Sequence, residues 1–240
     1  MLPLPTKEEL TAIYECYVEK GDRLAVERQR AQDVYPNKLK VVKSLVGGNR
    51  LLDVGAGLGT FVRVAMDAGF AAVGVEYSKE QCDVARRQYG INLLNDVIEN
   101  WSIYFHPGSF DVVNMHHVFE HLLYPRSILP CVHEILASGG VLLIEVPNQF
   151  NRLRGNHSFY PRFSGYSGNP LHHQSFFSPK NLIRMVSSEG FSLITCRQFR
   201  ENSEYDRGFV WNFSRKMYRY VVNKFSVGGG SFIECYFLKN

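Results

Sequence analysis

The sequence predicts an α/β fold built on a doubly wound, mostly parallel sheet of seven strands. Two observations support this prediction. From residue 50 onward, short apolar runs alternate with segments of helical periodicity, which is the pattern of βαβ units. A glycine-rich turn also separates the first apolar run from the first helical segment. Units of this kind pack as a parallel sheet that is covered by helices on both faces.

The order of elements follows from the same alternation. The expected strands cover residues 50–54, 71–76, 91–95, 110–115, 141–146, 191–199 and 231–238. The expected helices of this domain cover residues 59–68, 79–89, 97–101, 128–136, 178–188 and 209–225. Residues 1–46 are expected to form an N-terminal helical cap, and 47–240 the main domain. Residues 147–177 break the alternation and are rich in Asn, Gly, His, Pro and aromatic residues, which predicts a lid loop.

Composition excludes several classes of protein. The 240 residues are 45% hydrophobic and 21% charged, which is ordinary for a folded domain. A net charge of +4 is too small for a dedicated nucleic-acid binder, so we expect no stable nucleic-acid partner. The five cysteines form no CxxC pair, which argues against a zinc knuckle or a disulfide framework. The sequence also shows neither a signal-peptide pattern nor an apolar stretch long enough to cross a membrane. Together with the scattered cysteines, this favours a cytoplasmic location.

The glycine-rich turn covers residues 53–60, DVGAGLGT. Its position between a strand and a helix makes a ligand-binding role credible, because glycines let a ligand approach the backbone closely. Glu76 ends the next expected strand and Asp96 the third. A carboxylate at the first position can accept hydrogen bonds from ribose hydroxyls, and one at the second could reach an adenine amino group. Taken alone, the glycine turn is more simply an ordinary turn, and each acid is more simply a capping or solvated residue. Together, the three features at successive strand ends favour a nucleoside-binding site.

The type of nucleoside ligand is indicated by the residues within the turn. A nicotinamide-dependent dehydrogenase has GxGxxG, whereas the last position here is Thr60. Asp53 ends the strand just before the turn, where a carboxylate would repel a pyrophosphate. S-adenosylmethionine (SAM) has no phosphates and carries a sulfonium and an ammonium group, which suit an acidic cradle. A dehydrogenase remains an alternative.

Several segments together resemble the class I SAM-dependent methyltransferases, which have a Rossmann-like fold. They are LLDVGAGLGTF, GVEYS, FDVVNMHHVFEHL and ILPCVHEILASGGVLLIEVPN, and the resemblance covers residues 45–200. The sequence is most similar to the ubiquinone-biosynthesis O-methyltransferases and related small-molecule and sugar methyltransferases. Members of that group carry a motif similar to Phe119-Glu120-His121, and later one similar to residues 173–178, HQSFFS.

This resemblance implies roles for individual residues. Gly55, Gly57 and Gly59 would line the methionine part of SAM, Glu76 would hold the ribose and Asp96 the adenine. Asn114 and His116 would border the site of methyl transfer. Residues 114–117 read NMHH and lack the (N/D/S)PP(F/Y) motif of many N-methyltransferases. The expected reaction is therefore O-methylation of a small-molecule acceptor, such as a sugar or a quinone-like phenol.

Six of the eight histidines fall in two groups, at 116, 117 and 121 and at 157, 172 and 173. Loops at the carboxyl edge of a parallel sheet form the ligand crevice, so both groups could face one site. We predict His121 and His173 as candidates for the general base that a hydroxyl acceptor needs, although either could serve packing alone.

The residues His117, Glu120 and His121 form HxxEH, which would share one face if the segment were helical. With one loop histidine added, this set suggests a site for a divalent metal. Packing or capping remains the simpler interpretation of these side chains.

Other functions remain open at this point. The expected helix 209–225 has an apolar and a basic face, which is typical of a helix packed on the core but would also allow peripheral membrane contact. A SAM-binding regulator without catalysis would need the same glycine turn. An RNA methyltransferase is a further alternative. The sequence does not predict an oligomeric state.

Overall fold

The computed structural model describes residues 22–148, 173–199 and 231–240. Its strands are β1 (Arg50–Val54), β2 (Ala71–Val75), β3 (Phe110–His116), β4 (Leu136–Pro147), β5 (Phe191–Phe199) and β6 (Phe232–Lys239). Its α-helices are α2 (Asp22–Asp33), α3 (Tyr35–Leu45), α4 (Thr60–Asp67), α5 (Lys79–Tyr89), α6 (Leu129–Ile135) and α7 (Pro179–Ser187). Short 3-10 helices are η1 (Ile98–Ile103), η2 (Phe119–His121) and η3 (Pro125–Ile128).

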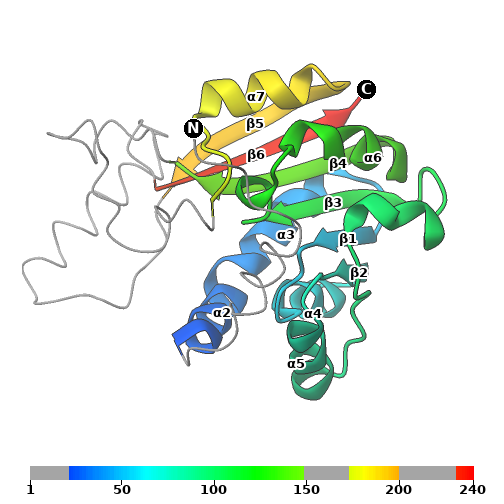
Figure 1. Cartoon of the computed structure of the whole chain (residues 1–240), viewed down its shortest axis with the longest axis vertical. Helices are drawn as coiled ribbons and strands as arrows, with labels where there is room; N and C mark the ends of the chain where they lie inside the picture. Colours follow the sequence, from blue (N-terminus) through cyan, green and yellow to red (C-terminus); the bar gives the residue numbers. More distant parts are fainter. Residues whose placement is uncertain (1–21, 149–172, 200–230) are drawn as a thin grey trace, which may run out of the picture.

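The strands form one sheet in the order β2-β1-β3-β4-β6-β5 (Figure 1). The pairs β1–β2, β1–β3 and β3–β4 are parallel. Strand β6 runs antiparallel to both of its neighbours, β4 and β5. The predicted mostly parallel, doubly wound α/β fold is therefore confirmed.

The predicted count of seven strands is wrong for the part of the chain that the structure describes. The segment expected as a strand at 91–95 makes only an isolated parallel bridge, between Leu94 and Val75. Leu94 N donates to Gly74 O, and Glu76 N donates to Leu94 O, each over 2.9 Å. The backbone then turns away, because Asp96 N donates back to Leu94 O. The bridge continues the sheet beyond β2, at the edge of the sheet.

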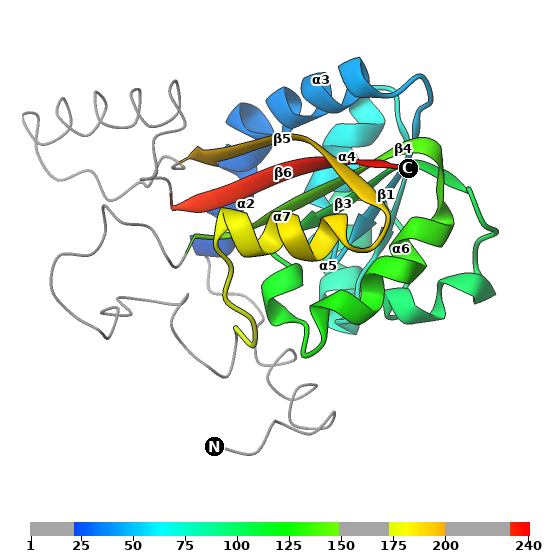
Figure 2. The ribbon, with the colours of Figure 1, turned by 90° about the horizontal axis from the view of Figure 1, so that it is seen from above.

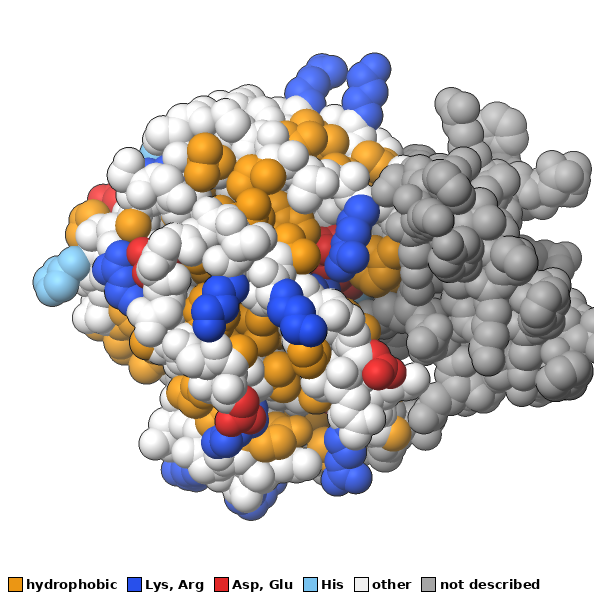
Figure 3. Space-filling view, turned by 180° about the vertical axis from the view of Figure 1, so that it is seen from behind, with side chains coloured by type: hydrophobic (Ala, Val, Ile, Leu, Met, Phe, Trp, Pro, Cys, Tyr) orange, Lys and Arg blue, Asp and Glu red, His pale blue; other side chains and the backbone are white. Residues whose placement is uncertain are grey.

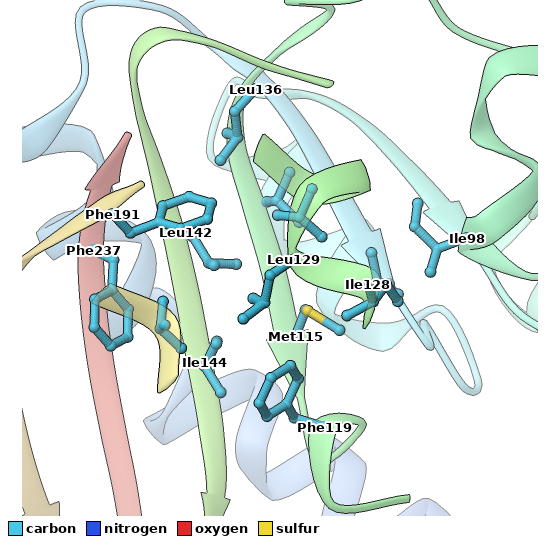
Figure 4. Packing of buried hydrophobic residues seen from close by; sticks show 14 of the residues in the cluster. Ile98, Met115, Phe119, Ile128, Leu129, Leu136, Leu142, Ile144, Phe191 and Phe237 are labelled. Atoms are coloured by element: carbon cyan, nitrogen blue, oxygen red, sulfur yellow. The ribbon is translucent and has the colours of Figure 1, made fainter. Parts of the chain in front are cut away.

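Helices cover both faces of the sheet (Figure 2). On one face, α3 and α4 pack over β1, β3 and β4 around Leu39, Val42, Phe61 and Leu143. On the other face, α6 and α7 pack on the strands. Figure 4 shows this second core, where Leu129 of α6 lies beside Met115 of β3 and Leu142 of β4. The sheet is thus buried on both sides, as its apolar strands require.

Local signals explain where the helices begin and end. Ser78 caps α5 by accepting a hydrogen bond from Gln81 N, and Gly90 ends the helix in the left-handed region. Ser178 and Asn181 form a reciprocal capping box at the start of α7, which satisfies two backbone donors. The expected N-terminal cap at 1–46 is described only from residue 22, as α2 and α3. The lid predicted at 147–177 lies largely outside the described residues, and the helix predicted at 209–225 lies wholly outside them. His157 and His172 also lie outside them.

Candidate active site

The glycine-rich turn connects β1 to α4 and is held against the end of β2. Gly55 N and Ala56 N both donate to Val75 O, over 2.8 and 3.0 Å. Gly55 has φ of 68° and Gly59 has φ of 75°, a backbone region that favours glycine. A Cβ at Gly55 would also lie 2.4 Å from a Val118 methyl carbon. The turn therefore requires glycine for both conformation and space.

The Glu76 carboxylate joins this turn to the start of α5. One carboxylate oxygen accepts a hydrogen bond from Gly57 N, and the other accepts one from Ser78 N, each over 2.8 Å. The side chain is largely buried. These two hydrogen bonds fix the carboxylate beside the glycine turn, and the contact with ribose predicted for it stays a prediction.

Asp96 makes contacts that organise the following 3-10 helix. Its Oδ1 accepts from Val97 N and from Asn100 Nδ2, and its Oδ2 accepts from the Tyr104 hydroxyl over 2.7 Å. The predicted contact with adenine stays a prediction. These three hydrogen bonds hold the carboxylate against the first residues of η1 and against Tyr104.

Asp53 and Asn114 face each other in the register of β1 and β3. Asn114 Nδ2 donates to Asp53 Oδ1 over 2.6 Å, and both side chains are buried. Burial raises the pKa of Asp53 to about 7, although the Asn114 hydrogen bond acts in the opposite direction. The Asn114 Oδ1 atom is buried without a hydrogen-bond partner among the described residues. An unpaired buried acceptor of this kind indicates a place where a ligand donor fits.

His116 lies further along β3 and faces the α3 side of the sheet. Its Nε2 is 3.1 Å from Glu145 Oε1, and its ring meets the Tyr35 ring edge-on. Burial, together with the nearby Lys38 charge, lowers the pKa of His116 well below its ordinary value, so the ring is neutral. Its predicted role beside the cofactor is untested, and its described contacts are with Tyr35 and Glu145.

Sequence reasoning missed a buried ion network beside His116. Lys38 of α3 is fully buried, and its Nζ contacts Glu145 of β4 and lies 3.3 Å from Glu234 Oε2 of β6. Arg197 Nε lies 2.5 Å from the other Glu234 oxygen. The available signal was an acidic residue inside each of two apolar strands, VLLIEV and FIECYF, since a buried acid in a sheet requires a partner.

The HxxEH segment does not form the helix on which a shared face for its three side chains depended. His117 has φ of 55°, and it is the one non-glycine residue with positive φ in the described ranges. Only Phe119–His121 forms a 3-10 helix there. His117 Nδ1 nevertheless lies 3.2 Å from Glu120 Oε1, and its Nε2 lies 3.4 Å from Glu145 Oε1. A non-glycine residue in this backbone region is strained, and here the strain places one imidazole between two buried carboxylates.

The two histidines predicted as candidate bases lie together. The rings of His121 and His173 are 4.9 Å apart in an edge-to-face arrangement. His173 is brought there because Gln174 N and Ser175 N both donate to Glu120 O. His121 Nε2 lies 3.9 Å from Glu120 Oε1. Segments far apart in the sequence therefore converge at the carboxyl end of β3.

Among the described residues, two groups of side chains have ligand atoms close enough to hold a metal ion. The first is Glu120, His121 and His173, and the second is His116, His117 and Glu145; within each, the atoms lie within 4.8 Å of one another. The Lys38 ammonium on Glu145 disfavours a cation at the second group. In the first group, the buried Glu120 Oε2 has no hydrogen-bond partner in the described part of the chain. Burial raises the pKa of Glu120 to about 8, so its charged form is disfavoured there. A bound cation would compensate the charge of that carboxylate. The donor set of the first group therefore fits a divalent metal.

The fold and the glycine turn together define a class I SAM-dependent methyltransferase domain. Residues 26–195 match the family model described as "Methyltransferase domain", and the chain belongs to this family. It is 26% identical over 167 residues to the malonyl-[acyl-carrier protein] O-methyltransferase of Paenibacillus sp. (strain JDR-2), covering 65% of this chain and 60% of that protein. It is 29% identical over 111 residues to a ubiquinone biosynthesis O-methyltransferase of Actinobacillus pleuropneumoniae serotype 7 (strain AP76), covering 42% of this chain and 47% of that protein. The chain thus spans about half to three fifths of the length of these relatives.

Solved structures support the same fold. A SAM-dependent methyltransferase from Archaeoglobus fulgidus has a TM-score of 0.65 at 18% identity, covering 92% of this chain and all of that one. An S-adenosylmethionine-dependent methyltransferase from Mesorhizobium loti has a TM-score of 0.59 at 14% identity, covering 87% of this chain and all of that one. At these identities the likeness concerns the fold alone.

Proposed function

We propose that this chain transfers a methyl group from SAM to an oxygen atom of a small-molecule acceptor. The observation that supports the proposal most strongly is the Glu76 carboxylate, which accepts from the glycine turn and from the start of α5. Near the carboxyl ends of β3 and β4 lie the imidazoles of His116, His117 and His121. A carboxylate suited to a nucleoside and a cluster of imidazoles at the carboxyl ends of strands in the same sheet support methylation of a hydroxyl.

In this reaction SAM supplies a methyl group that is electrophilic because it is bonded to a sulfonium. The acceptor oxygen forms a bond to the methyl carbon while the carbon–sulfur bond breaks, and S-adenosylhomocysteine leaves. His121 or His173 takes the hydroxyl proton on a ring nitrogen. The protein's remaining task is to hold the two reactants in line, a task to which the rigid turn and the buried Asp53–Asn114 pair contribute.

A divalent metal bound by Glu120, His121 and His173 is the alternative within this proposal, in which the two imidazoles act as ligands and not as bases. Such an ion would lower the pKa of an acceptor hydroxyl and orient it. The unpaired Glu120 oxygen supports this idea. Methyl transfer assays with and without a chelator would test it, with the same protein reloaded with zinc or magnesium as the control.

The first experiment is a calorimetric titration with S-adenosylhomocysteine. We expect micromolar affinity that is weakened at least tenfold in Glu76→Ala and unchanged in Glu80→Ala, a control at an exposed position of the next helix. NAD(H) titrated in parallel should not bind. Failure of the folded protein to bind S-adenosylhomocysteine would contradict the proposal, and binding of NAD(H) instead would favour a dehydrogenase.

The remaining alternatives make different predictions. A regulatory SAM-binding protein would bind S-adenosylhomocysteine and show no turnover with any phenol, sugar or carboxylate acceptor. An RNA methyltransferase would show salt-dependent RNA affinity. On the face shown in Figure 3, lysine and arginine side chains are spread among neutral and hydrophobic ones, so this face offers no concentrated basic surface. None of the described helices is long and apolar enough to cross a membrane. The helix expected to make peripheral membrane contact lies outside the described residues.

A further inference from the structure

Two cysteines lie directly opposite each other on the last two strands of the sheet. Cys196 of β5 is the register partner of Cys235 of β6 in the antiparallel pair. Cys235 is fully buried in the hydrophobic cluster that α7 completes, and Cys196 packs against the same cluster while remaining partly exposed. The two side chains therefore project to the same face of the sheet.

This placement satisfies the geometry that a disulfide needs. Opposed residues of antiparallel strands have Cα atoms about 4.5 or 5.5 Å apart, and disulfides span roughly 4.4–6.8 Å between Cα atoms. The two thiols lie close enough for each to shift the pKa of the other. A disulfide could therefore form without a rearrangement of either strand.

The two thiols also differ in the way that a stepwise oxidation requires. The neighbouring Cys235 lowers the pKa of the Cys196 thiol, while Cys196 and burial raise the pKa of Cys235. Cys196 is thus the better nucleophile as well as the more exposed thiol. Burial raises the pKa of two other described cysteines, Cys82 and Cys131, and neither has a thiol partner among the described contacts.

We propose that Cys196 and Cys235 are a reversible redox-modification site, which a peroxide converts to an intramolecular disulfide. The Cys196 thiolate attacks one peroxide oxygen, giving a sulfenic acid and releasing hydroxide. The Cys235 sulfur then attacks the sulfenic sulfur, so that the sulfur–sulfur bond forms and water leaves. The sum is two thiols and one hydrogen peroxide giving one disulfide and two waters.

The disulfide would fasten the edge of the sheet. In the described part of the chain β5 pairs with β6 alone, so its backbone hydrogen bonds open when this one pairing separates. A covalent link at Cys196 would keep the strands together. We therefore expect slower amide hydrogen exchange across β5 in the oxidised protein than in the reduced protein. This inference is independent of the proposed methyl transfer.

The test is peptide mapping of the full chain after brief treatment with hydrogen peroxide and removal of the peroxide by catalase. Remaining thiols are alkylated under denaturing conditions before digestion. We expect a peptide pair joined through Cys196 and Cys235 that dithiothreitol separates, with Cys82 and Cys131 alkylated as internal controls. Cys235→Ala should leave Cys196 as a sulfenic acid that dimedone traps, and Cys196→Ser should leave Cys235 unmodified.

Three outcomes would overturn the proposal. The first is the absence of the linked pair, with Cys196 still alkylated. The second is over-oxidation of Cys196 while Cys235 stays reduced in the wild-type chain. The third is a link between two chains rather than within one. The wild-type protein provides these readouts by itself, so the conclusion does not depend on whether a variant folds.

Discussion

Replacing Lys38 with methionine should strongly destabilise the protein. The Lys38 ammonium contacts Glu145 and Glu234, and all three side chains are buried. Without it, Glu234 keeps Arg197 and the Tyr236 hydroxyl. Glu145 keeps only the imidazoles of His116 and His117 among its described contacts, so its charge loses the one ammonium that it contacts. Breaking a buried ion pair in this way costs about 3–5 kcal/mol, which corresponds to a fall in Tm of roughly 6–20 °C for a chain of this size.

The pH dependence of this loss distinguishes a charge effect from a packing effect. Burial is the largest single influence on Glu145 and raises its pKa, but the charge and hydrogen bond of Lys38, together with the charges of His117 and Arg30, outweigh burial and lower the net pKa. In the wild-type protein, Glu145 therefore contributes stability above its unfolded pKa, and this contribution is lost as the pH falls through the folded pKa. In Lys38→Met burial is opposed only by the charges of His117 and Arg30, so the folded pKa of Glu145 rises and its ionised form costs more stability. The difference between the two proteins should thus be larger near about pH 8 than near about pH 5.

Urea unfolding followed by circular dichroism at the two pH values provides the measurement. Lys40→Met, at an exposed position of the same helix, is the matched control and should change the free energy of unfolding by no more than about 0.5 kcal/mol. The reasoning would be refuted if Lys38→Met cost no more than Lys40→Met. It would equally be refuted if the cost did not shrink toward low pH.

Three further predictions concern the glycine turn and its surroundings. Gly74→Ala should lower the free energy of unfolding by about 1–3 kcal/mol, because the new Cβ would lie 2.5 Å from a leucine side chain. Gly47→Ala is the control and should leave the stability nearly unchanged, because no atom lies within 4 Å of its Cβ position. The urea midpoints of the two variants and the wild type provide the comparison. The pKa of Asp53 in the folded protein is raised to about 7, so the protonated carboxyl stabilises the fold at low pH. This stabilisation is lost as the pH rises toward about 7. Asp53→Asn should therefore flatten this fall in stability between about pH 5 and 7, and an unchanged slope would contradict the assignment. His173→Ala should weaken zinc binding at least tenfold by calorimetry while the exposed His106→Ala does not; equal affinities would remove the metal hypothesis.

The regular part of the fold could be predicted because its signals are local. The strands at 50–54 and 191–199 and the helix at 79–89 have the bounds that apolar runs and capping residues predicted. The 91–95 segment has the same apolar character as a strand. It fails to become one because the following backbone folds back onto Leu94, a tertiary effect that periodicity does not record.

The glycine turn and Glu76 were likewise predictable, whereas the ion network was not. Lys38 stands two residues from the exposed Lys40 on the same helix, and nothing in the local sequence distinguishes them. Their different environments depend on which strands α3 crosses. His117 illustrates the same limit, since a helical spacing was assumed where the backbone enters the left-handed region. The acids that Lys38 and His117 contact were the better signal, because Glu145 interrupts an otherwise apolar strand.

The position of β6 has a consequence for how this chain is made. Strand β6 lies between β4 and β5, although both precede it in the sequence. From Phe199 at the end of β5 to Phe232 at the start of β6 the chain advances 33 positions, which a ribosome translating 5–20 residues per second covers in roughly 2–7 seconds. During that interval β4 and β5 each keep one edge unpaired, because β6 has not yet been made. Unpaired strand edges pair readily with other chains. Slow codons between these strands, or crowded polysomes, should therefore increase aggregation of the nascent protein.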